Sequence, residues 1–318
     1  MRMAVIGCGR WGSFIAWYLH HIGHEVTLYG REGSAHMVQF MQTRSNGLVT
    51  FGPGVRLTCD LDEAMRAEVI CISVGAQSLS QLMAQISGYD ASGKTFVLCM
   101  KGIEVGTCRR LSQIVRDALG EACGVAVWLG PGHVQEFLAG VPNCMVIDSD
   151  SEAVKVRLVS LLSGGLIRFY YGTDLIGNEI GAAARNVIGI AAGMLDGMGV
   201  SSLKGALMSR GTREIARLID AMGGDERSAY GLCHLGDYEA TVFSRYSHNR
   251  RFGELFVTGQ TYSELAEGDA TVRALCQIAQ RAGVELPICA AVDEVLHHGA
   301  DAEGTMNGLF TRSPKHEF

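Results

Sequence analysis

Short apolar runs alternate with amphipathic segments in the first half of the chain, which is the pattern of strands and helices in an α/β domain. The predicted strands are residues 1–6, 25–29, 57–58, 68–74, 95–100, 124–129, 144–148 and 166–171. The predicted helices are residues 14–23, 61–66, 78–86 and 108–118. This alternation predicts a doubly wound, Rossmann-type nucleotide-binding domain over residues 1–173.

The strand pattern disappears after residue 174, and apolar residues then recur at helical spacing. The predicted helices are residues 174–198, 202–221, 226–233, 249–257, 269–283 and 287–298. The polar tail from residue 304 is expected to end loosely. We therefore expect an all-α second domain over residues 174–318, with the active site in the cleft between the two domains.

The first helix of this second domain is unusually rich in small side chains. Gly181, Gly189 and Gly193 interrupt it, and each costs about 1 kcal/mol relative to alanine. Such a helix is expected to have neighbours that approach its backbone closely. Charge is rarely buried without a partner or a function, so Arg185, set among these small residues, belongs either to a structural ion pair or to a substrate site.

The strongest chemical motif is Gly7-Cys8-Gly9-Arg10-Trp11-Gly12, between the first strand and the first helix. Gly7 permits the tight turn, Gly9 lets the backbone approach a pyrophosphate, and Gly12 allows close packing of helix on strand. The helix N-terminus then faces the phosphates. We predict that this turn binds NAD or NADP.

The residues after the second strand favour NADP over NAD. That position normally carries an acid that binds the ribose hydroxyl of NAD, but here it reads Tyr29-Gly30-Arg31-Glu32. Arg31 could bind the 2′-phosphate of NADP. In the alternative, Arg31 is a solvated loop residue and Glu32 binds the ribose.

Three other segments carry candidate binding groups. Lys101 follows a strand, at the edge where ligands bind in such sheets. The loop Gly130-Pro131-Gly132-His133 follows another strand and could wrap a ligand. Ser247-His248-Asn249 precedes a helix that carries Arg250 and Arg251, which predicts an anion site unless the two arginines are merely solvated and Ser247 is a cap.

Composition narrows the class of protein. A net charge of −6 and a pI of about 5.9 leave no basic footprint for nucleic acid. The ten cysteines have neither paired nor zinc spacing, which predicts reduced thiols and a cytoplasmic location without a metal site. The sequence has no apolar run of membrane-spanning length and no signal peptide.

The chain resembles the bacterial type of NAD(P)-dependent glycerol-3-phosphate dehydrogenase nearly end to end. The resemblance rests on GCGRWG, the Lys101-Gly-Ile-Glu segment, GPGHVQEF, YGTDLIGNEIGAAARNVIGIAAG, SRGTREIARL, LGDYEAT, SHNRRFGEL, AEG at 266–268 and GVELPI at 283–288. It implies an oxidoreductase acting on a CH–OH group, which interconverts dihydroxyacetone phosphate and sn-glycerol 3-phosphate for phospholipid biosynthesis. A homodimer is a candidate assembly.

The resemblance also implies roles for individual residues. It places the cofactor on Gly7, Gly9, Arg10, Trp11, Gly12, Arg31, Lys101, Glu136 and Glu267. It assigns substrate binding to Gly130, Gly132, His133, Asn186, Thr241, Ser247, His248 and Asn249. The catalytic candidates are Arg185, Lys101 and Asp237.

Three positions depart from the family pattern. Arg185 stands where the family has its acid–base lysine, and His248 stands where it has an arginine that grips the substrate phosphate. Gly132-His133 replaces a Ser-Phe pair. Arginine is a poor proton donor near neutral pH, whereas histidine titrates there, so Lys101, His133 and His248 are candidates for moving the proton.

These departures leave two alternatives open. The first is a divergent member of the family that acts on another small anionic hydroxy or keto compound, such as a phosphonate or a carboxylate. The second is a nucleotide-binding homologue with impaired catalysis.

Overall fold

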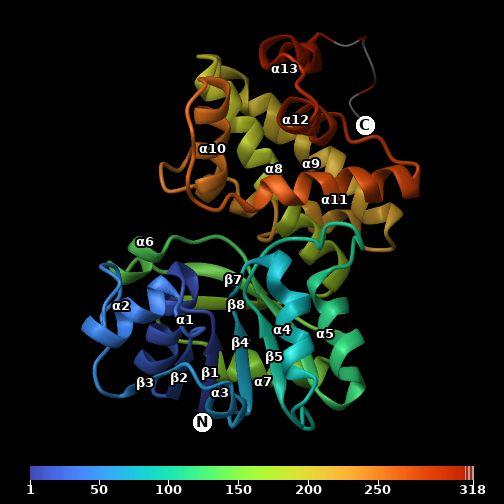
Figure 1. Cartoon of the computed structure of the whole chain (residues 1–318). Coiled ribbons are helices and arrows are strands. Elements are labelled where there is room, and N and C mark those ends of the chain that lie inside the picture. The colour runs from blue at the N-terminus through green and yellow to red at the C-terminus, as the bar shows by residue number, and fades with distance from the viewer. Residues whose placement is uncertain (312, 314–315, 317–318) are drawn as a thin grey trace. The chain divides into compact units, whose positions relative to one another are not determined.

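The computed structural model describes residues 1–311, 313 and 316, which form two compact units. The first unit comprises Met1–Lys101 and Arg109–Leu175, and the second joins Gly102–Cys108 to the chain from Ile176 onward (Figure 1). Ile103 is fully buried in the core of the helical unit. A single division at residue 173 therefore misses the segment between Lys101 and Arg109.

The first unit contains one eight-stranded sheet with the order β3-β2-β1-β4-β5-β6-β7-β8. Its strands are Arg2–Ile6 (β1), Glu25–Tyr29 (β2), Val55–Thr58 (β3), Val69–Ile72 (β4), Thr95–Leu98 (β5), Gly124–Leu129 (β6), Asn143–Asp148 (β7) and Ile167–Tyr171 (β8). All neighbours are parallel except β6 and β7, which are antiparallel. The predicted doubly wound fold is confirmed, with a mixed sheet.

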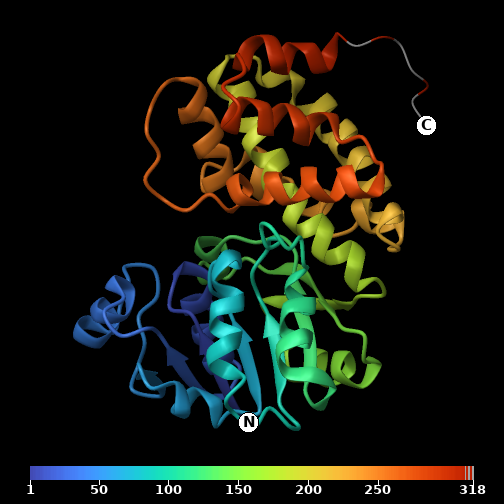
Figure 2. The same cartoon turned by 45° about the vertical axis from the view of Figure 1, so that its right-hand side comes forward.

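Helices cover both faces of this sheet. They are Arg10–His21 (α1), Ala35–Thr43 (α2), Leu61–Met65 (α3), Leu79–Ile86 (α4), Leu111–Leu119 (α5), Val134–Leu138 (α6) and Glu152–Leu162 (α7). Helices α1 and α7 share a buried cluster with one face of the strands. Helices α4 and α5 lie along the other face, in front of the strands in Figure 2. The sequence pattern did not predict α2, α6 or α7.

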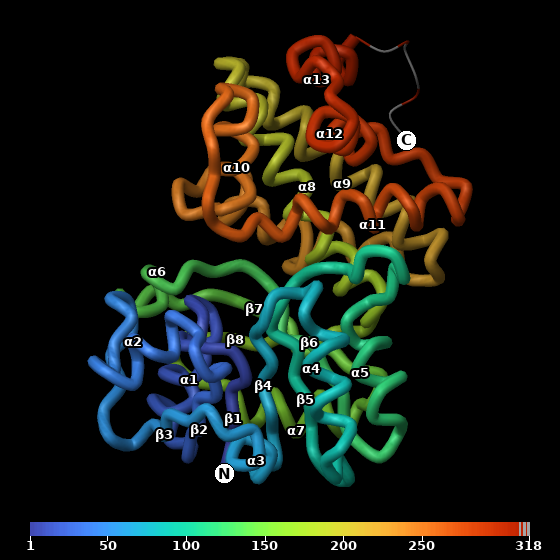
Figure 3. Tube along the Cα trace, viewed as in Figure 1, coloured from blue at the N-terminus to red at the C-terminus, as the bar shows by residue number. Residues whose placement is uncertain are grey.

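The second unit is helical, as predicted. Its α-helices are Leu175–Gly197 (α8), Lys204–Ala221 (α9), His248–Val257 (α10), Glu267–Ala282 (α11), Pro287–His297 (α12) and Ala302–Phe310 (α13). Shorter helical turns are Glu226–Tyr230 and Leu235–Asp237, and Glu239–Phe243 is a π-helix. In Figure 3 the trace of α8 runs through the middle of this unit.

Two predictions for this unit need correction. The helix predicted over 226–233 is a short 3-10 helix that ends at Tyr230. The loose tail predicted from residue 304 is wrong as far as Phe310, because α13 forms there and buries Met306. Most of the remaining tail lies outside the described residues.

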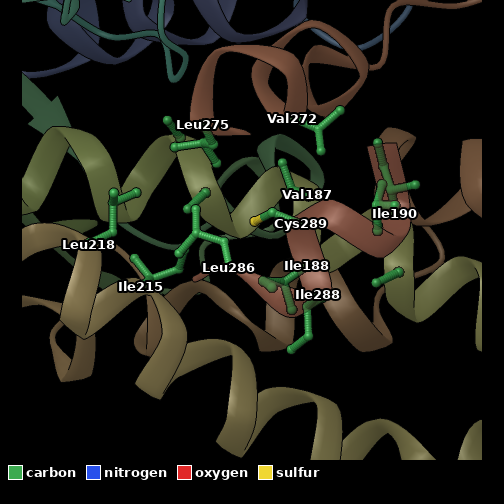
Figure 4. Packing of buried hydrophobic residues seen from close by; sticks show 14 of the residues in the cluster. Val187, Ile188, Ile190, Ile215, Leu218, Val272, Leu275, Leu286, Ile288 and Cys289 are labelled. Carbon is green, nitrogen blue, oxygen red and sulfur yellow. The ribbon is translucent and has the colours of Figure 1, made fainter. Parts of the chain in front are cut away.

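Aliphatic side chains of four helices form the core of the helical unit (Figure 4). Val187, Ile188 and Ile190 of α8 meet residues of α9, α11 and α12 there, and all three are fully buried. Burying an aliphatic side chain of this size contributes about 1.5–3 kcal/mol. The chain therefore builds its second core around α8.

The glycines of α8 are sites of close approach, as predicted. A Cβ atom on Gly193 would lie 1.9 Å from the carbonyl oxygen of Arg250, and one on Gly189 would lie 2.5 Å from a methyl group of Thr241. Conversely, a Cβ on Gly253 of α10 would lie 2.1 Å from the carbonyl oxygen of Ile190. Any side chain at these positions would push α10 away from α8.

No helix within residues 1–311 combines the length and the apolar character needed to cross a bilayer. The same part of the chain holds no group of three or more metal-ligating side chains suited to an ion. All ten cysteines are free thiols.

Candidate active site

The glycine-rich turn between β1 and α1 has the geometry that its sequence predicts. Gly7 has φ +114°, and a Cβ there would lie 2.1 Å from the carbonyl oxygen of Ser73. A Cβ on Gly12 would lie 1.9 Å from the carbonyl oxygen of Gly7. A Cβ on Gly9 would meet no protein atom within 4 Å. Packing thus requires glycine at positions 7 and 12. Gly9 leaves open space in which a ligand can approach the backbone, which fits a dinucleotide.

Two other predicted cofactor residues lie on α1, next to α6. Nη2 of Arg10 donates to Oε1 of Gln135 over 2.6 Å. The ring centroids of Trp11 and Phe137 are 6.3 Å apart. Glu136 is exposed on α6 between these two contact residues. The structure therefore brings Arg10, Trp11 and Glu136 to one place beside the glycine-rich turn.

Arg31 lies just beyond β2, whose end is bonded to the same turn. The backbone N–H of Gly7 donates to the carbonyl of Tyr29 over 2.9 Å. A Cβ on Gly30 would lie 2.6 Å from Sγ of Cys8. Arg31 itself is exposed. Its exposed guanidinium, two residues past the strand, suits a phosphate on the adenosine ribose.

Lys101 and the loop after β6 meet at the carboxyl ends of neighbouring strands. Nζ of Lys101 donates to the carbonyl oxygen of Gly130 over 2.8 Å. Gly130 and Gly132 have φ +131° and +149°, a region that favours glycine. His133 is the N-cap residue of α6. The predicted residues Lys101, Gly130, Gly132 and His133 therefore come together within the first unit.

The catalytic candidates of the helical unit form one buried cluster. Nε of Arg185 lies 2.8 Å from Oδ2 of Asp237, and the exposed fractions of the two side chains are 15% and 1%. The Nε–H bond is not directed at an acceptor, so this contact is an ion pair rather than an aligned hydrogen bond. Nη1 of Arg185 also donates to the hydroxyl of Thr241, which in turn donates to the carbonyl of Asp237 over 2.8 Å. The guanidinium is thus held on two sides.

Asn186 and Asn249 are buried and join three helices. Nδ2 of Asn249 donates to Oδ1 of Asn186 over 2.9 Å, and Oδ1 of Asn249 accepts from the backbone N–H of Gly268 over 2.9 Å. This chain of bonds ties α8 and α10 to the first turn of α11, where Glu267 lies. Both asparagine side chains therefore hold helices together, in addition to the binding roles predicted for them.

The predicted anion segment is engaged inside the unit. Oγ of Ser247 accepts from the backbone N–H of Arg250 and caps α10. Nδ1 of His248 lies 2.5 Å from the hydroxyl of Tyr262 and 3.2 Å from Oε2 of Glu264. Neither Tyr262 nor Glu264 was predicted, and no motif in the sequence marks them.

Arg250 is not available as an anion-binding side chain, contrary to the sequence prediction. Its Nη1 lies 2.5 Å from Oδ2 of Asp196, and its Nε donates to the carbonyl of Ser244. Asp196 also binds Nζ of Lys204 over 2.6 Å. Nη1 of Arg250 also lies 3.3 Å from Oε2 of Glu254. A cation that already faces two carboxylates inside the protein contributes little to a substrate site. Arg251, in contrast, is exposed.

A buried histidine and tyrosine flank Asp237, and neither was predicted from the sequence. Nδ1 of His234 bonds the carbonyl of Gly181 over 2.8 Å, and its Nε2 lies 2.7 Å from the hydroxyl of Tyr238. Both side chains are fully buried. Burial lowers the pKa of His234 from an ordinary 6.5 to about 4, the bond to Gly181 opposes this shift, and the charge of Arg185 adds to it. Burial likewise raises the pKa of Tyr238. The available signal in the sequence was a histidine and a tyrosine four residues apart, with Asp237 between them.

The neutral state of His234 predicts acid sensitivity. The unfolded chain binds a proton at this residue below about pH 6.5, whereas the folded chain does so only below about pH 4. The free energy of unfolding is therefore expected to fall by up to about 3 kcal/mol as the pH drops through that window.

Thermal denaturation between these pH values measures this loss, compared between wild type and His234→Leu. The variant should lose most of the slope, whereas His24→Leu should keep it, since His24 also bonds a carbonyl but is only partly buried. An unchanged slope in His234→Leu would contradict the assignment.

Comparison with known proteins covers nearly the whole chain. Residues 2–155 match the family described as NAD-dependent glycerol-3-phosphate dehydrogenase N-terminus, and residues 174–307 match the corresponding C-terminus. The chain is 34% identical to glycerol-3-phosphate dehydrogenase (NAD(P)+) of Prosthecochloris aestuarii, with 100% of both chains covered. It is 36% identical to the enzyme of the same name from Thermobifida fusca, covering 99% of this chain and 98% of the other.

A solved structure supports the same relationship. The crystal structure of glycerol-3-phosphate dehydrogenase from Coxiella burnetii superimposes with a TM-score of 0.91 at 27% identity, covering 98% of this chain and 99% of the other. The predicted fold class and the predicted class of NAD(P)-dependent dehydrogenase are confirmed. The chain belongs to the NAD-dependent glycerol-3-phosphate dehydrogenase family.

Proposed function

We propose that this protein reduces dihydroxyacetone phosphate to sn-glycerol 3-phosphate with NADPH or NADH, and catalyses the reverse reaction. The observation that carries the proposal is Arg185, a largely buried cation held by Asp237 and Thr241 at the position of the family's catalytic lysine. A fixed positive charge in a protected site is suited to the oxygen of a carbonyl that becomes an alkoxide.

The chemistry divides among few groups. Held at the glycine-rich turn beside Gly9, the nicotinamide cofactor would supply the hydride that reduces the carbonyl carbon. Arg185 stabilises the negative charge that develops on the carbonyl oxygen, and Asp237 keeps the guanidinium oriented. Since a guanidinium does not release a proton near neutral pH, we assign proton transfer to Lys101, with His133 and His248 as the alternatives.

Substrate binding is assigned to the groups that the resemblance names. We propose that Ser247, His248 and Asn249 hold the phosphate at the start of α10, where helix N–H groups favour an anion. Asn186 and Thr241 contact the substrate from α8 and the π-helix. Gly130 and Gly132, both at positive φ, would offer backbone atoms to the substrate in the first unit. Glu136 and Glu267 contact the cofactor.

The test is oxidation of NADPH and NADH by the purified protein with a panel of substrates. Dihydroxyacetone phosphate should be turned over fastest, ahead of its phosphonate analogue and of small keto acids. Faster turnover of a phosphonate or a carboxylate would show a divergent substrate. Cofactor binding without turnover of any compound would show a homologue with impaired catalysis.

Arg31 is expected to favour NADPH over NADH. A charge-assisted hydrogen bond contributes about 1.5–3 kcal/mol, so Arg31→Ala should weaken NADPH binding about 10- to 100-fold. NADH binding should change little, because NADH lacks the 2′-phosphate. Fluorescence titration of both cofactors measures this, with Arg44→Ala as a control, since Arg44 bonds the carbonyls of Phe51 and Gly52. Equal losses for both cofactors would assign the preference elsewhere.

We further propose that the protein acts in the cytoplasm and assembles as a homodimer. The free thiols at all ten cysteines support a reducing compartment. Light scattering of the purified protein tests the assembly.

A further inference from the structure

We propose that His234 and Tyr238 are positioning residues that fix Arg185 for catalysis, an inference that rests on the function proposed above. Neither side chain belongs to the candidate site itself. Together these two side chains form what we term the His234–Tyr238 clamp. Its effect is transmitted through the two segments that carry Arg185, Asp237 and Thr241.

The hydrogen bonds of the clamp determine the tautomer of His234. A backbone carbonyl can only accept, so the bond to Gly181 requires a proton on Nδ1 of His234. In the neutral ring Nε2 is then an acceptor, and the hydroxyl of Tyr238 donates to it. Both ring nitrogens are used, so the ring is fixed in orientation as well as in place.

One end of the clamp binds the helical turn that carries Arg185. In an α-helix the carbonyl of residue 181 is the acceptor for the N–H of residue 185, and it is this carbonyl that His234 bonds. A Cβ on Gly181 would lie only 3.0 Å from Cβ of His234. The absence of a side chain at position 181 therefore allows the imidazole to reach the backbone beneath Arg185.

The other end fixes the segment that holds the guanidinium. The N–H of Asp237 donates to the carbonyl of His234 over 3.1 Å, and the N–H of Thr241 donates to the carbonyl of Tyr238 over 3.0 Å. This segment is a 3-10 turn followed by the π-helix Glu239–Phe243. π-Helical turns are rare and found frequently at functional sites, and such irregular backbone needs anchors to hold a defined position. The side chains of His234 and Tyr238, which are fully buried and bonded to each other, supply such an anchor on each side of Asp237.

The experiment is a double-mutant cycle with Tyr238→Phe and Arg185→Ala. Tyr238→Phe removes one oxygen atom and keeps the ring in the core, so folding should survive. If the clamp acts through Arg185, Tyr238→Phe should lower kcat for dihydroxyacetone phosphate about tenfold in the wild-type background. In the Arg185→Ala background it should change kcat by less than about twofold, because effects of groups that act as a unit are not additive.

Tyr18→Phe is the matched control, since Tyr18 is also fully buried and its hydroxyl donates to the carbonyl of Leu162 over 2.6 Å. It should cost comparable thermal stability and leave kcat unchanged. The affinity for NADPH should be unaffected in both tyrosine variants. An equal loss of kcat from Tyr238→Phe in both backgrounds, or no loss in wild type, would overturn the positioning role.

A second measurement separates this inference from the proposed function. The crystal structure of Tyr238→Phe should show the guanidinium of Arg185 displaced from Oδ2 of Asp237, whatever substrate the enzyme uses. An unmoved ion pair would overturn the clamp even if dihydroxyacetone phosphate is the substrate. Displacement in a protein that does not turn over this substrate would leave the clamp in place and refute the proposed function.

Discussion

Replacement of Arg185 by alanine is expected to lower kcat/KM for dihydroxyacetone phosphate about 10²- to 10³-fold. Removing one preorganised group that stabilises transition-state charge typically has this effect. It also removes the guanidinium that pairs with the buried carboxylate of Asp237. Steady-state kinetics with NADPH held at saturation measures the loss, and binding of NADPH should be unchanged.

Arg185→Lys gives the sharper comparison. Lysine keeps the positive charge near Asp237, and its pKa falls when it is buried, so it can exchange a proton where a guanidinium cannot. Turnover of dihydroxyacetone phosphate is therefore expected to rise above the wild-type value. A lower turnover would mean that the site is fitted to a guanidinium and to another anion. Wild-type rates in both variants would make Arg185 a structural residue only.

The largest effect on cofactor binding is expected from Gly9→Val. The side chain would fill the open space in front of the glycine-rich turn, where no protein atom lies within 4 Å of the new Cβ. NADPH binding should weaken by at least about 100-fold, or about 2.8 kcal/mol. Because the substitution meets no protein atom, the melting temperature should change little. Fluorescence titration and thermal denaturation together test both statements.

Gly165→Val is the matched control for this variant. Gly165 also belongs to the first unit, and a Cβ there would likewise meet nothing within 4 Å. The control should bind NADPH as wild type does. Unchanged affinity in Gly9→Val would remove the glycine-rich turn from the cofactor site.

Local patterns predicted much of this structure. The strands came from short apolar runs, and the glycine-rich turn was placed by its position between a strand and a helix. Lys101 and Gly130 were expected at one edge of the sheet, and a hydrogen bond joins them there. The glycines of α8 were expected to mark close approach, and Gly193 lies against the backbone of α10. Each of these features could be predicted because it depends on neighbouring residues in the sequence or on the topology of the sheet.

Contacts between segments distant in sequence were not predictable in this way. Nothing near Arg250 indicates that Asp196 neutralises it, because that pairing depends on how α8 and α10 pack. The same holds for Glu264, which lies beside His248 through a loop without any motif. The assignment of Gly102–Cys108 to the helical unit was also not predictable. Ile103, which is buried in the core of that unit, looks like any other apolar residue in the sequence.

The most direct test is the fate of the transferred hydride. The wild-type protein is incubated with dihydroxyacetone phosphate and NADPH dideuterated at C4 of the nicotinamide, and the product is analysed by mass spectrometry and NMR. The proposed function predicts glycerol 3-phosphate carrying one deuterium, bound to C2. Failure to form deuterated glycerol 3-phosphate, with the cofactor bound but not oxidised, would contradict it.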